Sequence, residues 1–170
     1  MVKKNLEHLK KEFDEVSKDI KDKNCLDLKD FLRIFNYKAN VEFEIDKREI
    51  CRVTKEAFDE KRSLPEKLEL LFSLKGVGLP MASAILAMKY PEKYAIVDRN
   101  VIKALRSRRY NIKSIPTNLQ DNNERKRAIG LYEEYMKALK VLQGQDCEFK
   151  EKTFREIEIK LFEEGRTKNG

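Results

Sequence analysis

The stretch from Lys75 to Arg106 holds the residues whose types and spacing point most clearly to chemistry. It contains a Gly76-Val77-Gly78 turn between two segments with helical patterns. Glycine permits left-handed backbone conformations and lets the chain come close to an anion. The amides of such a turn and the positive N-terminal end of the next helix face outward together, which makes an anion site. Taken alone, the pattern is usually only a turn, so its context decides the interpretation.

Basic side chains accompany this turn. Lys75 directly precedes it and could contact a phosphate as a point charge. A run of cations then extends over fifteen residues without one acidic residue, although the chain has 30. Most charge runs are solvated helix faces, but the exclusion of acids favours a surface that contacts phosphates. Each such contact would add about 0.9 to the slope of log K for binding against log salt concentration. The run consists of Arg99, Lys103, Arg106, Arg108, Arg109 and Lys113.

Asp98 directly precedes the helix expected from Arg99, and it has two interpretations. As an N-cap it would stabilise that helix by about 1 kcal/mol. A carboxylate can also stabilise positive charge that develops on a reacting group. For an isolated aspartate before a helix the cap is the better interpretation, and the two roles can coexist.

Helices must position these residues. Apolar residues recur at steps of three and four, as in residues 6–20, and together they predict an all-α protein of seven to nine helices. Ser63 and Glu66 form a capping box that starts one of them. Gly165 is expected to end the last helix. The alternation over residues 41–45 is expected to be a short strand or an extended lead-in. Further helices are expected over about 28–37, 50–58, 80–90, from 99, and over about 121–143 and 154–165.

Composition narrows the possible functions. The chain has 170 residues, with 37 basic and 30 acidic side chains and a net charge of +7. This length suits one compact unit, residues 1–170, and we expect a monomer. The positive balance makes an acidic partner such as nucleic acid plausible. No apolar run approaches the roughly 20 residues that cross a bilayer, so no membrane partner is expected.

The metal-binding and nucleophilic residue types are scarce. His8 is the single histidine, which excludes a histidine-based zinc site and a protease triad within the chain. Cys25, Cys51 and Cys147 are far apart and form no C-x-x-C pair, which argues against a structural zinc or a four-cysteine iron–sulfur cluster. We therefore expect no metal site among the side chains. Unpaired cysteines and the lack of a signal peptide predict a cytoplasmic protein.

The segment from Leu74 to Leu105 resembles a known family. It reads LKGVGLPMASAILAMKYPEKYAIVDRNVIKAL, that is, a helix end, a G-V-G turn, a helix of small residues, an extended run and an aspartate that begins another helix. This order resembles the helix-hairpin-helix superfamily of base-excision DNA glycosylases, which includes endonuclease III and the adenine-specific mismatch glycosylases. The interval from Gly78 to Asp98 is the one that the family shows between its hairpin and its catalytic aspartate.

The resemblance implies a fold and an activity. Residues 30–110 would form a lobe with the helix-hairpin-helix motif, and residues 1–29 and 111–170 a second helical lobe, with Asp98 at the cleft between them. The expected activity is the recognition of a damaged or mispaired base in double-stranded DNA and the hydrolysis of its N-glycosidic bond. Asp98 would stabilise the oxocarbenium-like sugar while water attacks. The residues expected to contact DNA are Lys75, Gly76, Val77, Gly78, Arg99, Lys103 and Arg106.

The sequence departs from the family at one important position. Members that also cut the DNA backbone carry a lysine two residues after the second hairpin glycine, where its amine forms a Schiff base with the sugar. This chain has Pro80 there, so a lyase step through that position is excluded and the expected enzyme is monofunctional. Lys89 and Lys93 could supply another amine, although no spacing supports either. The family permits an alkali-metal ion on hairpin carbonyls, and no other cofactor is expected.

Two other interpretations stay open. A module of the same fold could bind DNA or sense its structure without catalysis, which the missing lysine and the short chain favour. A helical interaction protein that binds no DNA is the third. The sequence does not decide whether the chain is an enzyme, and it does not identify the base or lesion.

Overall fold

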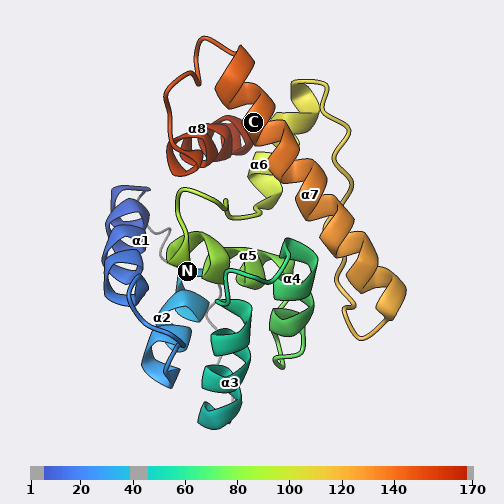
Figure 1. The fold of residues 1–170 in the computed structure, drawn as a ribbon. Coiled ribbons are helices and arrows are strands. Elements are labelled where there is room, and N and C mark those ends of the chain that lie inside the picture. Colours follow the sequence, from blue (N-terminus) through green and yellow to red (C-terminus); the bar gives the residue numbers. More distant parts are fainter. Residues whose placement is uncertain (1–5, 39–45, 168–170) are drawn as a thin grey trace.

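The structure of the chain is a computed structural model that describes residues 6–38 and 46–167. Within these segments it contains eight α-helices and no strand (Figure 1), which confirms the all-α prediction for the described residues. The alternating residues 41–45 lie outside them. The helices are α1 (Leu6–Ile20), α2 (Leu28–Lys38), α3 (Lys47–Ala57), α4 (Leu64–Phe72), α5 (Leu79–Lys89), α6 (Arg99–Ser107), α7 (Asn122–Gln145) and α8 (Phe154–Thr167).

The capping box predicted at the start of α4 is present. The Ser63 N–H donates to Glu66 Oε2 at 2.7 Å, and the Glu66 N–H donates to Ser63 Oγ at 3.5 Å. Pro65 lies in the first turn, where its missing N–H leaves no bond unmade. Local sequence therefore fixes where α4 begins.

Gly165 does not end the last helix, contrary to the prediction, because α8 continues to Thr167. It is buried where α8 crosses α6, and these two helices share the most extensive contact among those in the described chain. A Cβ built on Gly165 would lie 1.9 Å from the backbone oxygen of Asn100. The glycine is therefore required for close packing. The end expected near residue 143 for the long helix is also too early, because α7 includes Gly144 and runs to Gln145.

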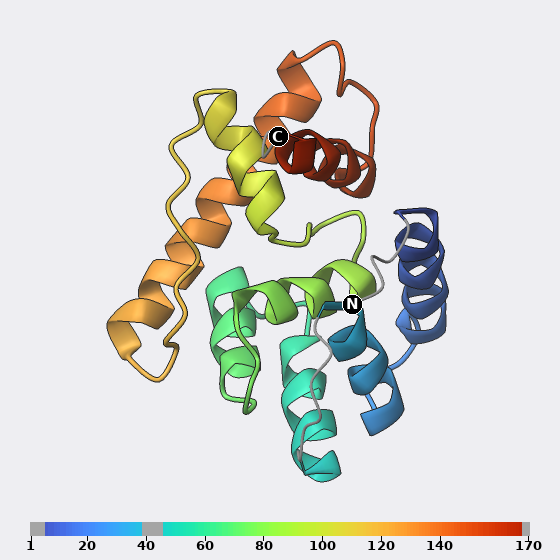
Figure 2. The same ribbon diagram turned by 180° about the vertical axis from the view of Figure 1, so that it is seen from behind.

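α5 is the central helix. Every residue of it except Pro80 is buried. Helices α1, α2 and α4 pack against it, and α3 packs against α4 (Figure 2). In the described residues no helix combines the length and the apolar character needed to cross a membrane.

The helix contacts fall into two groups. In the first group, α1, α2 and α4 pack on α5, and α3 packs on α4. In the second group, α8 packs on α6 and α7. A contact between α7 and α4 joins the two groups. α1 packs mainly on α2 and α5, although it was expected with the C-terminal helices; it reaches α8 where the Arg155 guanidinium lies 4.6 Å from the Phe13 ring centroid. The division into two lobes with a cleft, and the boundary at residues 30–110, stay predictions.

Two of the three cysteines are bonded, which corrects the expectation that all are unpaired. Cys25 and Cys51 form a disulfide with their Cα atoms 5.0 Å apart, and it ties the segment before α2 to α3. Cys147 is exposed and free. No motif spacing signals a pair separated by 26 residues. The cysteines therefore no longer support a reducing compartment, since disulfides persist mainly in oxidising ones.

Candidate nucleic-acid interface

The turn between α4 and α5 contains one glycine in a left-handed backbone conformation. Gly76 has φ 77°, in the left-handed region where other residues are strained. The Val77 N–H donates to Leu74 O at 3.1 Å, and both of these apolar side chains are buried and anchor the turn. Lys75 and Gly76 are exposed. The turn therefore presents its backbone and one cation to solvent while its apolar residues hold it to the core.

The start of α5 follows directly. Gly78 is the N-cap, in extended backbone, and supplies no capping side chain. The first amides of a helix have no partner within the helix, and the positive end of its dipole lies there. Pro80 removes one of these amides. An anion at this end would thus meet the turn and the remaining first-turn amides.

Asp98 is half-buried and caps α6. Its Oδ1 accepts from the Asn100 N–H at 2.7 Å, so the capping role is present in the structure. Burial is the main cause that raises the pKa of Tyr135 on α7, followed by the negative charges of Glu158 and Asp98. The Asp98 carboxylate therefore lies close enough to α7 to act on this hydroxyl.

The segment from Tyr94 to Asp98 brings the aspartate back toward the start of α5. The Tyr94 N–H donates to Tyr90 O, near the end of α5. The Val97 N–H donates to Ser83 Oγ at 3.0 Å. Ser83 lies about one helical turn after the start of α5. Asp98 is thus held over the first half of the helix that the glycine turn begins.

The cations do not form one uniform patch. Arg99 and Lys103 are exposed on α6. Arg106 is also exposed, but its Nε donates to Ile112 O at 2.7 Å and its Nη2 to Ser114 Oγ at 3.2 Å, so it also holds the chain after α6. The DNA contacts of these three residues stay predictions.

Arg108 does not belong to the candidate surface, although it lies in the run without acids. Three carboxylates from distant parts of the chain surround its guanidinium, at 2.9 to 3.2 Å. A window free of acids in sequence is therefore not free of them in space. The carboxylates are those of Asp146, Glu148 and Glu164.

Lys89 is not available as a substitute amine. It is 8 % exposed, and its Nζ donates to the carbonyls of Ile20, Lys21 and Lys23 at the end of α1. Burial lowers its pKa. The ammonium of Lys89 thus serves as a helix C-cap. Lys93 is exposed, and its Nζ lies 3.9 Å from a carboxylate oxygen of Glu60.

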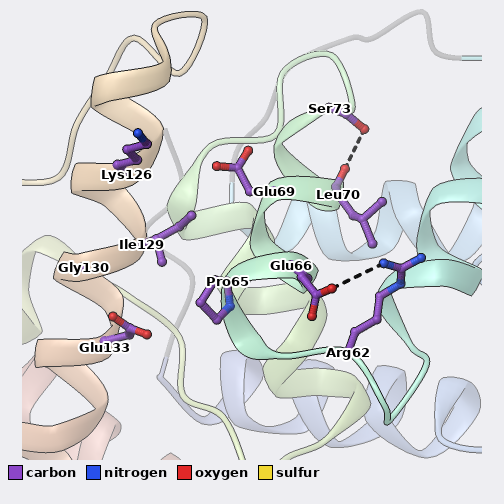
Figure 3. Close-up of a pocket in the computed structure, with 10 residues that line it drawn as sticks. All are labelled: Arg62, Pro65, Glu66, Glu69, Leu70, Ser73, Lys126, Ile129, Gly130 and Glu133. Carbon is purple, nitrogen blue, oxygen red and sulfur yellow. Dashed lines mark hydrogen bonds and ion pairs between the residues drawn. The ribbon is translucent and has the colours of Figure 1, made fainter.

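A groove of about 660 Å³ lies between α4 and α7 (Figure 3). The apolar surface of the groove comes from Pro65, Leu70 and Ile129. Ser73, at the C-terminal end of α4, also lines the groove. Neither Asp98 nor the glycine turn lines this groove. It is therefore not the predicted cleft.

The hairpin carbonyls fit an alkali-metal ion in ligand type, since hard cations take oxygen ligands. Leu74 O already accepts from the Val77 N–H, and Gly78 O from the Ala82 N–H. A carbonyl oxygen has two lone pairs, so each can accept a second partner. An ion there would hold the turn in shape.

Alkaline pH is expected to destabilise the protein through Tyr132 and Tyr135. Burial raises the pKa of both well above the ordinary value of 10. The folded protein therefore keeps protons that the unfolded chain loses above pH 10, and stability falls as pH rises, by about 1.4 kcal/mol per pH unit for each tyrosine. The lowered pKa values of Lys67 and Lys89 act in the opposite sense, but only below their ordinary value of 10.5.

Denaturant unfolding between pH 10.5 and 11.5, with tyrosinate absorbance as a second probe, tests this expectation. Tyr135→Phe should reduce the slope by about one proton, or about 1.4 kcal/mol per pH unit. An unchanged slope in this variant would show that Tyr135 titrates normally in the folded protein.

Several residues at this site were not predicted as part of it. They are Ser83, Tyr132 and Tyr135, whose hydroxyls bond the segment before Asp98. The sequence carries no signal for such bonds, because the partners lie 14 to 39 residues away.

Comparison of the chain with known protein families, with curated proteins and with solved structures finds no match.

Proposed function

We propose that this protein is a monofunctional DNA glycosylase of the helix-hairpin-helix type. The observation that carries the proposal is the connection between two parts of the candidate site. Asp98 begins α6 directly after a segment tied to Ser83, and Ser83 lies in the helix that the positive-φ Gly76 turn introduces. Base release requires a turn that binds a phosphate of the duplex and a carboxylate at a fixed distance from it. Here α5 connects the two, because the turn precedes α5 and Ser83 of α5 bonds the residue before Asp98.

The chemistry follows from the residue types. The turn, with Lys75 and the α6 cations Arg99 and Lys103, would hold phosphates without reading sequence. With the target nucleotide turned out of the stack, its N-glycosidic bond breaks and the electron pair leaves with the base. The Asp98 carboxylate stabilises the positive charge on the sugar. Water adds to C1′ and its proton passes to the departing base, which gives an abasic site and the neutral free base. Because Pro80 has no amine, the backbone is not cut.

A base-release assay tests the proposal. Duplexes with uracil, oxidised guanine, oxidised pyrimidines, alkylated purines or mismatches are incubated with the protein and then treated with alkali. Strand breaks that appear only after alkali are expected for at least one substrate. Breaks without alkali would contradict the monofunctional assignment.

A second candidate is a DNA-binding module without catalysis. The capping bond from Asn100 favours it, because the cap alone accounts for an aspartate at this position. It predicts duplex binding with no base release from any substrate. A protein that gives no gel shift with duplex at about 50 mM salt would instead be an interaction protein, since phosphate-dependent binding is strong at low salt.

Replacing Lys75 should weaken duplex binding equally for every DNA sequence. Lys75→Ala removes one exposed cation beside the turn. The slope of log K against log salt concentration should fall by about 0.9. Lys18→Ala is the matched control, because Lys18 is also exposed and its neighbour Ser17 bonds Met88 at the far end of α5. Equal slopes for both variants would show that Lys75 does not contact phosphate.

A further inference from the structure

Three consecutive buried residues precede Asp98 without belonging to a helix. Ala95, Ile96 and Val97 are each at most 2 % exposed. Buried backbone N–H and C=O groups need partners, and outside regular structure these must come from elsewhere in the fold. This segment therefore depends on side chains to hold it.

Each of these residues is bonded by a side-chain hydroxyl. The Tyr132 hydroxyl donates to Ala95 O at 2.8 Å, and the Tyr135 hydroxyl donates to Ile96 O at 2.7 Å. The two tyrosines are fully buried and lie three residues apart on α7, with ring centroids 6.3 Å apart. α7 thus fixes the two carbonyls of the segment.

Ser83 fixes the third residue from the other side. Its Oγ accepts from the Val97 N–H at 3.0 Å and donates to Pro80 O, also at 3.0 Å. A hydroxyl has one proton and two lone pairs, so it can do both, and alanine can do neither. Through this one oxygen, the first turn of α5 is bonded to the residue before Asp98.

We propose that Ser83, Tyr132 and Tyr135 are positioning residues that set the place of the Asp98 carboxylate relative to the glycine turn. The inference rests on the proposed function for its effect on base release. It makes α5 and α7 joint determinants of the reaction rate, because the three bonds come from both helices. Loss of one hydroxyl displaces the carboxylate, and misplacement by about 1 Å can lower a rate by about 100-fold.

The test compares hydroxyl deletions with matched deletions elsewhere. Tyr135→Phe and Ser83→Ala remove the proposed anchors, and Ser83→Thr keeps the hydroxyl. Tyr90→Phe is the control for the tyrosine, because Tyr90 donates to Phe58 O at 2.7 Å. Thr54→Val is the control for the serine, because buried Thr54 accepts from the Leu26 N–H and donates to Ile50 O.

Two readouts are needed. Single-turnover base release should fall about 10- to 100-fold in Tyr135→Phe and Ser83→Ala, with duplex Kd changed less than about twofold, and Ser83→Thr should restore the rate. The amide chemical shift of Asn100, recorded without DNA, reports its bond to Asp98. It should move in both anchor variants and stay in place in Tyr90→Phe and Thr54→Val.

The outcomes separate the two proposals. If the wild-type protein releases no base, the proposed function fails, and the Asn100 amide still decides whether the hydroxyls position Asp98. An unmoved Asn100 amide in Tyr135→Phe overturns the positioning role, as does a moved amide with an unchanged rate in an active enzyme. Should Ser83→Ala not fold, Tyr135→Phe gives the same readouts with its ring packing retained.

Discussion

Gly165→Ala should destabilise the protein by about 3 kcal/mol or more, because the new methyl group has no space. Its Cβ would lie 1.9 Å from the Asn100 backbone oxygen and 2.6 Å from the Asn100 carbonyl carbon. Both are backbone atoms, so no side-chain rotation relieves the overlap. α8 would have to move away from α6 along the most extensive helix contact in the described chain.

Gly130→Ala is the matched control and should have the opposite sign. Gly130 lies inside α7, and a Cβ there meets nothing within 4 Å. Replacing an interior helical glycine by alanine stabilises a helix by about 0.5–1 kcal/mol. Denaturant unfolding of the two variants, with equal m values, measures the contrast. Stabilisation by Gly165→Ala would show that α6 and α8 do not cross at this point in solution.

The helices could be predicted because their signals are local. The apolar face of α1 and the Ser63–Glu66 capping box each lie within a few turns of the chain. Gly165 was misassigned for the same reason. Glycine after an apolar helical stretch is typical of a helix end, and only the position of Asn100 reveals a packing contact.

The candidate site shows the same limit. The glycine turn and the Asp98 cap were predictable, since a positive φ and a capping aspartate each have a local residue preference. The carboxylates around Arg108 lie 38 to 56 residues from it, and the Cys25–Cys51 bond spans 26 residues. These pairings depend on how helices pack, which periodicity does not specify.

Asp98→Asn should abolish most base release while leaving the fold intact. Asparagine is about as good an N-cap as aspartate, so its oxygen can still accept from the Asn100 N–H. The substitution therefore removes the negative charge and keeps the cap. Loss of one preorganised group that stabilises transition-state charge costs about 100- to 1000-fold in rate. Duplex affinity should stay the same or rise slightly, because a negative charge near phosphates is removed.

Asp121→Asn is the control that separates charge from capping. Asp121 caps α7 as Asp98 caps α6, with its Oδ1 accepting from the Asn123 N–H at 2.6 Å. Both variants should unfold within a few tenths of a kcal/mol of the wild type, since Asn and Asp cap equally. Only Asp98→Asn should lose base release in a single-turnover assay with alkali. If both retain it, Asp98 is only a cap and the sugar cation must be stabilised by another group. If Asp98→Asn alone loses it, the charge at the start of α6 is what the reaction uses.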